Sequence, residues 1–205
     1  KKVLNYFDVL IYLILSNFKK RKYKNFTELL IVAIKKNHQN KGLGSYLLKE
    51  SFDITKLSHK IINELCSQEP DRKVNIQIKD SMPVKGDTDL VEILLDNLIG
   101  NAWKYSRKKQ QTDIEVGYTT HLGNNIYFVR DCGSGFDMKF ADQLFKPFNR
   151  LHSPEEFEGS GIGLATVSRI IERHHGKIWA ESTLGEGSTF FFTLFPTSSN
   201  SATNI

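Results

Sequence analysis

After residue 50, hydrophobic residues recur first at helical and then at strand spacing. Residues 51–68 begin as a short apolar strand and continue as a helix whose apolar face holds Leu57, Ile61, Ile62 and Leu65. Residues 73–80 alternate apolar and polar side chains, which predicts a half-buried strand. Residues 86–106 return to helical spacing, and Asp87 is placed to cap the start of that helix.

The second half of the chain predicts two strand pairs that flank a helix. The first pair covers 112–120 and 124–133, the helix covers 165–176, and a hairpin covers 177–182 and 187–196. Strands do not alternate regularly with helices, which disfavours a doubly wound parallel sheet. We therefore expect an α+β fold, a two-layer α/β sandwich whose mixed, mostly antiparallel sheet carries helices on one face.

The N-terminal residues differ from the rest in charge. Residues 1–50 hold 11 Lys and Arg against 3 Asp and Glu, whereas residues 51–205 hold 17 against 20. The overall charge of +5 therefore belongs to the N-terminal part and does not predict nucleic-acid binding. The apolar run at 3–15 is shorter than the about 20 residues of a membrane-spanning helix. A basic run follows at 19–24, so an amphipathic helix is favoured over a truncated membrane anchor.

The run GSGIGL at 159–164 leaves three alternatives for a glycine-rich loop. A dinucleotide-binding turn needs a glycine where Leu164 stands and a buried strand before Gly159, where the residues are acidic and polar. A P-loop needs a lysine, and none follows. The remaining alternative is a flexible loop that leads into a helix N-terminus, whose free N–H groups suit phosphate.

Polar side chains follow one side of the helix predicted over 86–106. Asn101 follows Asn97 by four residues, and Lys104 and, slightly rotated, Tyr105 follow Asn101 by three and four residues. Amide oxygens suit magnesium, an ammonium group suits phosphate and an aromatic ring suits a base. The alternative is an ordinary solvated helix face.

Asp131 ends a predicted strand, in the segment VRDCGSGFD. A carboxylate fixed there can accept a hydrogen bond from the exocyclic amine of a purine, and Gly133 and Gly135 would leave space for the ring. The alternative is a plain turn, in which Asp and Gly are common.

Together these segments resemble the catalytic ATP-binding domain of sensor histidine kinases, which has the Bergerat-type ATPase fold. The matching motifs, in family order, are the N box DNLIGNAWKYS, the first glycine box RDCGSGFDM, the phenylalanine box LFKPF, the second glycine box GSGIGLA and a closing hairpin that ends in TLFP. The stretches NAWKYS, FNRLHS and RIIERHHGKIWAES resemble the phytochrome-like, PAS-linked branch of bacterial kinases.

The resemblance implies a magnesium–ATP site with four catalytic residues. Asn101 would supply an oxygen to the metal, and Asn97 would lie near metal-bound water and phosphate. Lys104 would contact phosphate, and Arg150 would neutralise charge on the γ-phosphate. Related ATPases that hydrolyse ATP with water have a Glu at the place of Asn97, so the amide favours phosphoryl transfer over hydrolysis.

The resemblance also implies a set of ATP-binding residues. Asp131 would bind the adenine amino group, and Thr189 would join it through water. Phe145 and Phe148 would anchor a lid that hinges on the glycines of the second glycine box. The full set is Tyr105, Asp131, Gly133, Gly135, Phe145, Phe148, Gly159, Gly161, Gly163, Leu164 and Thr189.

The resemblance covers part of the chain only. We expect a catalytic domain at 51–196, a disordered tail at 197–205, and at 1–50 a basic, helical segment that is a remnant or divergent form of a dimerisation helix. None of the six histidines matches the family's phosphoacceptor pattern; the superficially similar segment around His59 has Lys60 where an acid is needed, and no proline follows.

Two functions follow from these expectations. In the first, a cytoplasmic domain donates the γ-phosphate of ATP to a histidine on a dimerisation hairpin, upstream in cis or in trans, for relay to a response regulator. The full-length protein would then be a homodimer that binds no nucleic acid, with its membrane association left open. In the second, the chain is an ATP-binding regulatory module without kinase activity of its own.

Overall fold

The computed structural model describes residues 51–149, 151, 156–157 and 159–195. The chain divides into two compact units, Lys1–Leu47 and Leu48–Ile205, and the described residues all belong to the second. The predictions for 1–50, for Arg150 and for the tail at 197–205 lie outside the described residues.

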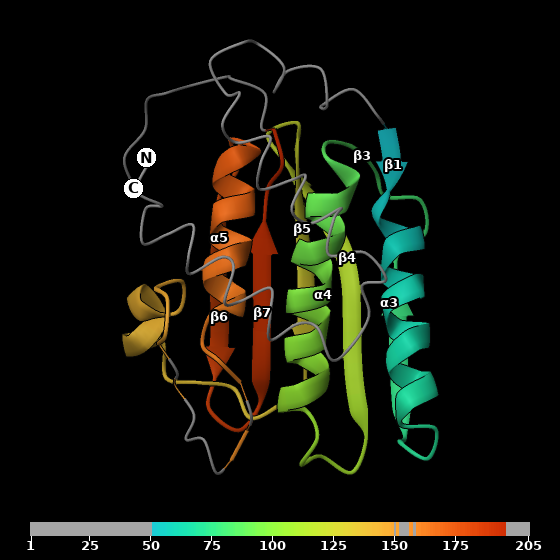
Figure 1. Ribbon diagram of the computed structural model, residues 1–205, viewed down its shortest axis with the longest axis vertical. Coiled ribbons are helices and arrows are strands. Elements are labelled where there is room, and N and C mark those ends of the chain that lie inside the picture. Colours follow the sequence, from blue (N-terminus) through green and yellow to red (C-terminus); the bar gives the residue numbers. More distant parts are fainter. Residues whose placement is uncertain (1–50, 150, 152–155, 158, 196–205) are drawn as a thin grey trace, which may run out of the picture. The chain divides into compact units, whose positions relative to one another are not determined.

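A five-stranded sheet forms one layer of the second unit, and helices cover one of its faces (Figure 1). The strand order is β2-β4-β5-β7-β6. Only β2 and β4 are parallel, and the other neighbours are antiparallel. The predicted α+β fold with a mixed, mostly antiparallel sheet is therefore confirmed. The strands are β2 Val74–Ile78, β4 Thr112–His121, β5 Asn124–Asp131, β6 Ile178–Thr183 and β7 Gly187–Phe192.

An aspartate caps the N-terminus of each of the first two described helices. In α3 (Ile54–Gln68) the carboxylate of Asp53 accepts a hydrogen bond from the Thr55 N–H at 3.0 Å. In α4 (Thr88–Tyr105) the carboxylate of Asp87 accepts one from the Leu90 N–H at 3.2 Å. Asp87 is thus the predicted cap, because its side chain satisfies an N–H group that the first helical turn leaves free.

The core lies between the sheet and its helices, with α4 at the centre (Figure 1). Leu94, Leu95 and Leu98 of α4 are fully buried, and so are Ile114 and Val116 of β4. Burying side chains of this size contributes about 1.5–3 kcal/mol each, so the central helix is held firmly against the sheet. Residues on that helix are therefore well suited to carry a precisely built site.

Three local elements differ from the predicted ones. The short strand predicted at the start of residues 51–68 is present as β1 (Ser51–Asp53), but β3 (Pro83–Lys85), with which it forms a separate two-stranded ribbon, was not predicted, and η4 (Met138–Gln143) is a 3₁₀ helix inside the predicted loop. Such short elements have no periodicity to detect. The last helix, α5, spans Gly163–Arg173 instead of 165–176, and the chain turns out of it through His175, which has φ of 54°.

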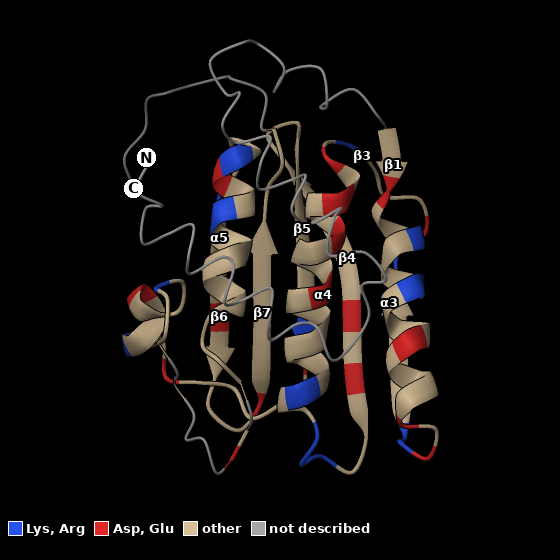
Figure 2. Ribbon diagram, viewed as in Figure 1, with Lys and Arg blue, Asp and Glu red and all other residues tan. Residues whose placement is uncertain are grey.

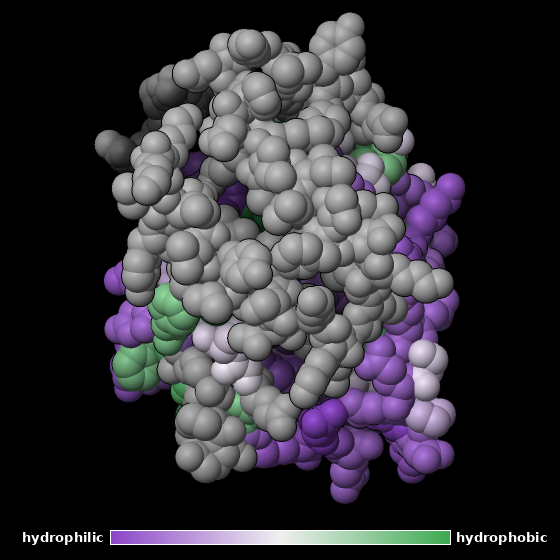
Figure 3. All heavy atoms as spheres, in the orientation of Figure 1, coloured by the Kyte–Doolittle hydropathy of each residue, from purple (hydrophilic) through white to green (hydrophobic). Residues whose placement is uncertain are grey.

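Hydrophobic side chains are exposed on η4 and in the loop after it. Figure 3, which has the same orientation as Figure 1, shows hydrophobic surface at the position of η4. Met138 is 42% exposed, Phe140 40% and Phe148 56%. In the described part of the chain, no helix combines the length and the apolar character needed to cross a bilayer.

Candidate functional site

The glycine-rich segment Gly159–Gly163 lies against α4. A Cβ atom added to Gly163 would come within 2.6 Å of Asn97 Oδ1, and one added to Gly159 would come within 3.3 Å of Lys104 Nζ. The structure therefore brings the second glycine box and the N box together, although the chain separates them widely.

Asn97 points its amide oxygen at the start of α5. Its Nδ2 donates a hydrogen bond to the Ile93 carbonyl at 2.8 Å, which leaves Oδ1 on the side of Gly163, the first residue of α5. The N-cap residue Ile162 forms no side-chain hydrogen bond with the helix, so the first N–H groups of α5 stay available for an anion. Half-buried Asn101 lies one turn further along the same side of α4.

The C-terminal end of α4 supplies positive charge. Lys104 Nζ lies 4.0 Å from the centroid of the Tyr105 ring, a distance typical of a cation–π contact. Figure 2 shows basic residues at this end of α4 and in the loop that follows, which carries Arg107, Lys108 and Lys109. A phosphate group near Gly159 would meet this positive charge.

Asp131 is a buried carboxylate at the end of β5. It is 8% exposed, and its Oδ1 accepts a hydrogen bond from the Gly133 N–H at 2.7 Å. Burial raises the pKa of Asp131 to about 6, although backbone hydrogen bonds from Gly133 and Ser188 act in the opposite direction. A desolvated carboxylate that keeps unused lone pairs is suited to accept from an N–H donor such as an exocyclic amine.

The glycines of the first glycine box allow close backbone packing. A Cβ atom on Gly133 would come within 2.7 Å of Asp131 Oδ1 and within 2.8 Å of the Tyr105 carbonyl oxygen. One on Gly135, whose φ is 59°, would overlap the Thr183 carbonyl oxygen. We predicted that both glycines leave room for a purine. The contacts give a different reason for these glycines. Gly133 allows close approach of the Asp131 carboxylate and the Tyr105 backbone, and Gly135 allows close approach of the β6–β7 hairpin.

Thr189 does not share a side of the sheet with Asp131, in contrast to the prediction. Its Oγ1 accepts a hydrogen bond from Arg130 Nε at 3.3 Å, and Arg130 is exposed. Ser188 is the residue paired with Asp131 in the β5–β7 register. Because side chains alternate along a strand, an error of one residue moves a side chain to the opposite face. Ser188, which sequence reasoning did not single out, is therefore the β7 side chain on the side of Asp131, and only the strand register identifies it.

The two predicted lid anchors, Phe145 and Phe148, differ in burial. Phe145 is half-buried, whereas the Phe148 ring is 56% exposed and its backbone is left-handed, with φ of 65°. The Phe148 N–H donates to the Gly161 carbonyl at 2.9 Å, so Phe148 meets the glycine segment through its backbone. The buried aromatic ring near α4 belongs instead to Phe157, 7% exposed, which no motif signalled. Leu164 is half-buried in the first turn of α5.

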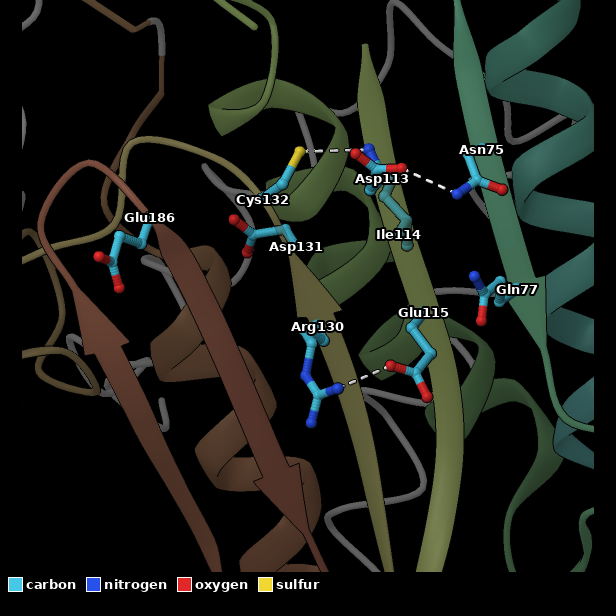
Figure 4. A pocket seen from close by; sticks show the side chains of 9 residues that line it. All are labelled: Asn75, Gln77, Asp113, Ile114, Glu115, Arg130, Asp131, Cys132 and Glu186. Atoms are coloured by element: carbon cyan, nitrogen blue, oxygen red, sulfur yellow. Dashed lines mark hydrogen bonds and ion pairs between the residues drawn. The ribbon is translucent and has the colours of Figure 1, made fainter.

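A cavity of about 280 Å³ lies on the opposite face of the sheet (Figure 4). Its polar lining comes from β2, β4 and β5, and Arg130 forms a 2.8 Å ion pair with Glu115 across it. Among the described residues that were predicted for the site, only Asp131 lines this cavity. The cavity therefore shares Asp131, but no other described residue predicted for the site, with the arrangement around α4.

Comparison with known proteins identifies a family. The model of the histidine kinase-, DNA gyrase B- and HSP90-like ATPases matches residues 86–198. Cyanobacterial phytochrome B of Nostoc sp. is 40% identical over 152 residues, which are 72% of this chain and 20% of the relative. The methanogenesis regulatory histidine kinase FilI of Methanothrix harundinacea is 36% identical over 137 residues, 66% of this chain and 15% of that protein. The chain thus spans at most about a fifth of these relatives.

Solved structures share the fold. The mycobacterial sensor histidine kinase MprB gives a TM-score of 0.59 at 21% identity, covering 71% of this chain and 95% of the other. The catalytic domain of histidine kinase ThkA gives a TM-score of 0.59 at 20% identity, with coverages of 71% and 93%.

Proposed function

Since the chain belongs to the family of histidine kinase-, DNA gyrase B- and HSP90-like ATPases, we propose that residues 51–196 are the ATP-binding catalytic domain of a sensor histidine kinase. The domain binds magnesium–ATP and donates the γ-phosphoryl group to a histidine on a dimerisation hairpin. One observation carries this proposal: the second glycine box packs on the N box, with Gly163 at Asn97 and Gly159 at Lys104.

The residues around α4 suit a magnesium-bound triphosphate. Asn97 and Asn101 offer amide oxygens, which are hard ligands of the kind that magnesium prefers. Lys104 and the N-terminus of α5 offer a cation and free N–H groups to the phosphates. Magnesium, when bound, would offset the negative charge of the transferred group. Arg150 would add a further positive charge at the γ-phosphate.

The adenine would lie at the other end of the site. Its amino group would donate to Asp131, where buried N–H groups already orient the carboxylate. Tyr105 would pack near the nucleoside, since its backbone lies beside Gly133, next to Asp131. Ser188, rather than Thr189, would complete this network because it is paired with Asp131.

Phosphoryl transfer suits this site better than hydrolysis. In transfer, an imidazole nitrogen forms a bond to the γ-phosphorus while the bond to the bridging oxygen breaks and ADP leaves. Such chemistry depends on positioning and charge neutralisation. Hydrolysis would need a base for water, and Asn97 has no carboxylate to act as one.

The acceptor histidine would come from outside the described residues. Among the described histidines, His174 is fully buried, and its ring nitrogens bond to the Ile170 carbonyl and the Asp87 N–H. His59 is exposed on α3 but is followed by a lysine. The acceptor would lie upstream in cis or on a partner chain, within a homodimer that passes phosphate to a response regulator.

Incubation with γ-labelled ATP, magnesium and an acceptor hairpin in trans tests the proposal. Label on the hairpin, lost in the Asn101→Ala variant, is the expected result. Binding of ATP without any label on the hairpin would favour the regulatory module, which the lack of a matching acceptor motif in this chain also suggests. Steady phosphate release without an acceptor would indicate a hydrolase instead.

A further inference from the structure

Phe157 is buried within a polar segment. It is 7% exposed, whereas its described neighbours Glu156, Gly159 and Ser160 are exposed. An aromatic side chain loses rotational freedom when it is buried, so a specific contact must compensate for that cost.

That contact is with the C-terminal end of α4. The ring centroids of Phe157 and Tyr105 lie 4.9 Å apart at an interplanar angle of 67°, an edge-to-face arrangement. Lys108 Nζ lies 4.9 Å from the Phe157 ring centroid and 3.2 Å from Glu156 Oε1. Two adjacent residues thus dock on α4 and the loop after it through an aromatic, a cation–π and an ionic contact.

Tyr105 connects this docking point to the glycine segment. Lys104 Nζ lies 4.0 Å from the Tyr105 ring centroid, and the same nitrogen would lie 3.3 Å from a Cβ on Gly159. Phe157 precedes Gly159 by two residues. Anchoring Phe157 on Tyr105 therefore restricts where the first glycine of the segment can lie.

We propose that Phe157 is a positioning residue that fastens the segment Gly159–Gly163 to the C-terminal end of α4 and thereby sets the affinity for the phosphates of the nucleotide. The inference rests on the proposed function. Glycine has the largest backbone entropy to lose, and a segment rich in it gains affinity when it is held in place before the ligand arrives. Phe157 acts on the glycine segment, so its effect falls on ligands that carry phosphates.

The test compares Phe157→Ala with the wild-type protein, using calorimetric titration of magnesium–ATP and of magnesium–ADP, with adenosine measured by competition. We expect affinity for both nucleotides to fall about tenfold, equivalent to about 1.4 kcal/mol, while affinity for adenosine changes less than twofold. Phe157→Leu keeps an apolar contact and should recover part of the affinity. Phe140→Ala is the matched control, because that ring is 40% exposed on η4, and it should leave all three affinities unchanged.

Three results distinguish a failure of the inference about Phe157 from a failure of the proposed function. Equal losses for adenosine and ATP would overturn the inference and make Phe157 a wall of the nucleoside site. Unchanged ATP affinity in both Phe157 variants would also overturn it. Failure of the wild-type protein to bind magnesium–ATP would instead refute the proposed function. If Phe157→Ala does not fold, the same comparison with Phe157→Leu, with a smaller expected loss for the nucleotides alone, decides the question.

Discussion

The two ends of α4 are fastened by different chemistry. At the N-terminal end, the fully buried ring of His174 accepts a hydrogen bond from the Asp87 N–H through Nε2 at 3.2 Å. Its Nδ1 lies 2.8 Å from the Ile170 carbonyl, to which it donates. Burial lowers the pKa of His174, so the neutral ring is the form that holds α5 to the start of α4.

At the C-terminal end, charged groups hold α4 in place. The Arg72 guanidinium lies 4.4 Å from the Trp103 ring centroid, and Glu69 accepts hydrogen bonds from Trp103 Nε1 at 3.3 Å and Arg107 at 2.6 Å. Glu69 and Arg107 remain partly exposed. The charged cluster thus borders the helix end that carries Lys104 and Tyr105.

The two ends of one helix should therefore depend on different solution conditions. We expect the buried neutral histidine to make the N-terminal end sensitive to pH, and the partly exposed ion cluster to make the C-terminal end sensitive to salt. Both ends must hold if Asn97, Asn101 and Lys104 are to keep the spacing on which the proposed phosphate contacts depend.

The largest expected effect is at the C-terminal end. Trp103 is 4% exposed, so Trp103→Ala should lower the free energy of unfolding by about 3–5 kcal/mol, as measured by urea denaturation. The matched control is Trp179→Ala, because Trp179 is only half-buried and stacks on Phe191 at 5.4 Å. A loss at Trp103 no larger than that at Trp179 would mean that the cluster does not anchor α4.

Gly163→Ala tests the contact between α4 and α5. The added methyl group would meet Asn97 Oδ1 at 2.6 Å, and overpacking of this kind costs about 1–3 kcal/mol. We expect magnesium–ATP affinity to fall by about tenfold or more, by calorimetric titration. The control is Gly100→Ala within α4, where the methyl group would meet nothing within 4 Å and should stabilise the helix by about 0.5–1 kcal/mol. Equal ATP affinity in both variants would argue against the contact.

The N-terminal end should weaken in acid. The pKa of His174 is lowered on folding, so below its ordinary value of 6.5 the unfolded chain binds the extra proton first and stability falls as the pH drops. One such group gives at most about 1.4 kcal/mol per pH unit. Asp131 has the opposite sign, because its raised pKa of about 6 means that the folded state binds the proton first.

Urea denaturation between pH 7 and pH 5 in an Asp131→Asn background isolates the histidine. The free energy of unfolding should decrease with falling pH in that variant, and the decrease should become smaller when His174→Gln is added. An identical pH slope in the two variants would show that His174 is not the titrating group.

The smallest effect concerns the exposed part of the charged cluster. Arg107 and Glu69 have side chains that are 64% and 33% exposed, so Arg107→Ala should cost about 0.2–1 kcal/mol. The loss should shrink in 1 M salt, where the screening length is about 3 Å. A salt-independent loss would indicate packing rather than charge.

Sequence periodicity predicted the long elements because their buried faces repeat. The apolar spacing of α4 and its Asp87 cap gave nearly the observed bounds, and the strand pairs were found with small shifts at their ends. The pairing of β1 with β3 and the 3₁₀ helix were missed, since three- to six-residue elements are set by tertiary contacts.

The motifs predicted which segments of the candidate site lie together. The motifs placed Asn97, Lys104 and the glycine segment in one site, and the structure brings them into contact. Ser188 was missed because strand register cannot be fixed from one strand alone. Phe157 was missed because a lone aromatic residue in a polar stretch has no periodic signal, and its burial depends on Tyr105 from another element.

A crystal structure with magnesium and a non-hydrolysable ATP analogue tests the central claim most directly. We predict that the adenine amino group lies within hydrogen-bond distance of the Asp131 carboxylate, while the phosphates lie between Asn97 and the N-terminus of α5. An analogue whose adenine amino group lies away from Asp131, or one whose phosphates lie away from Asn97 and Lys104, would contradict this prediction.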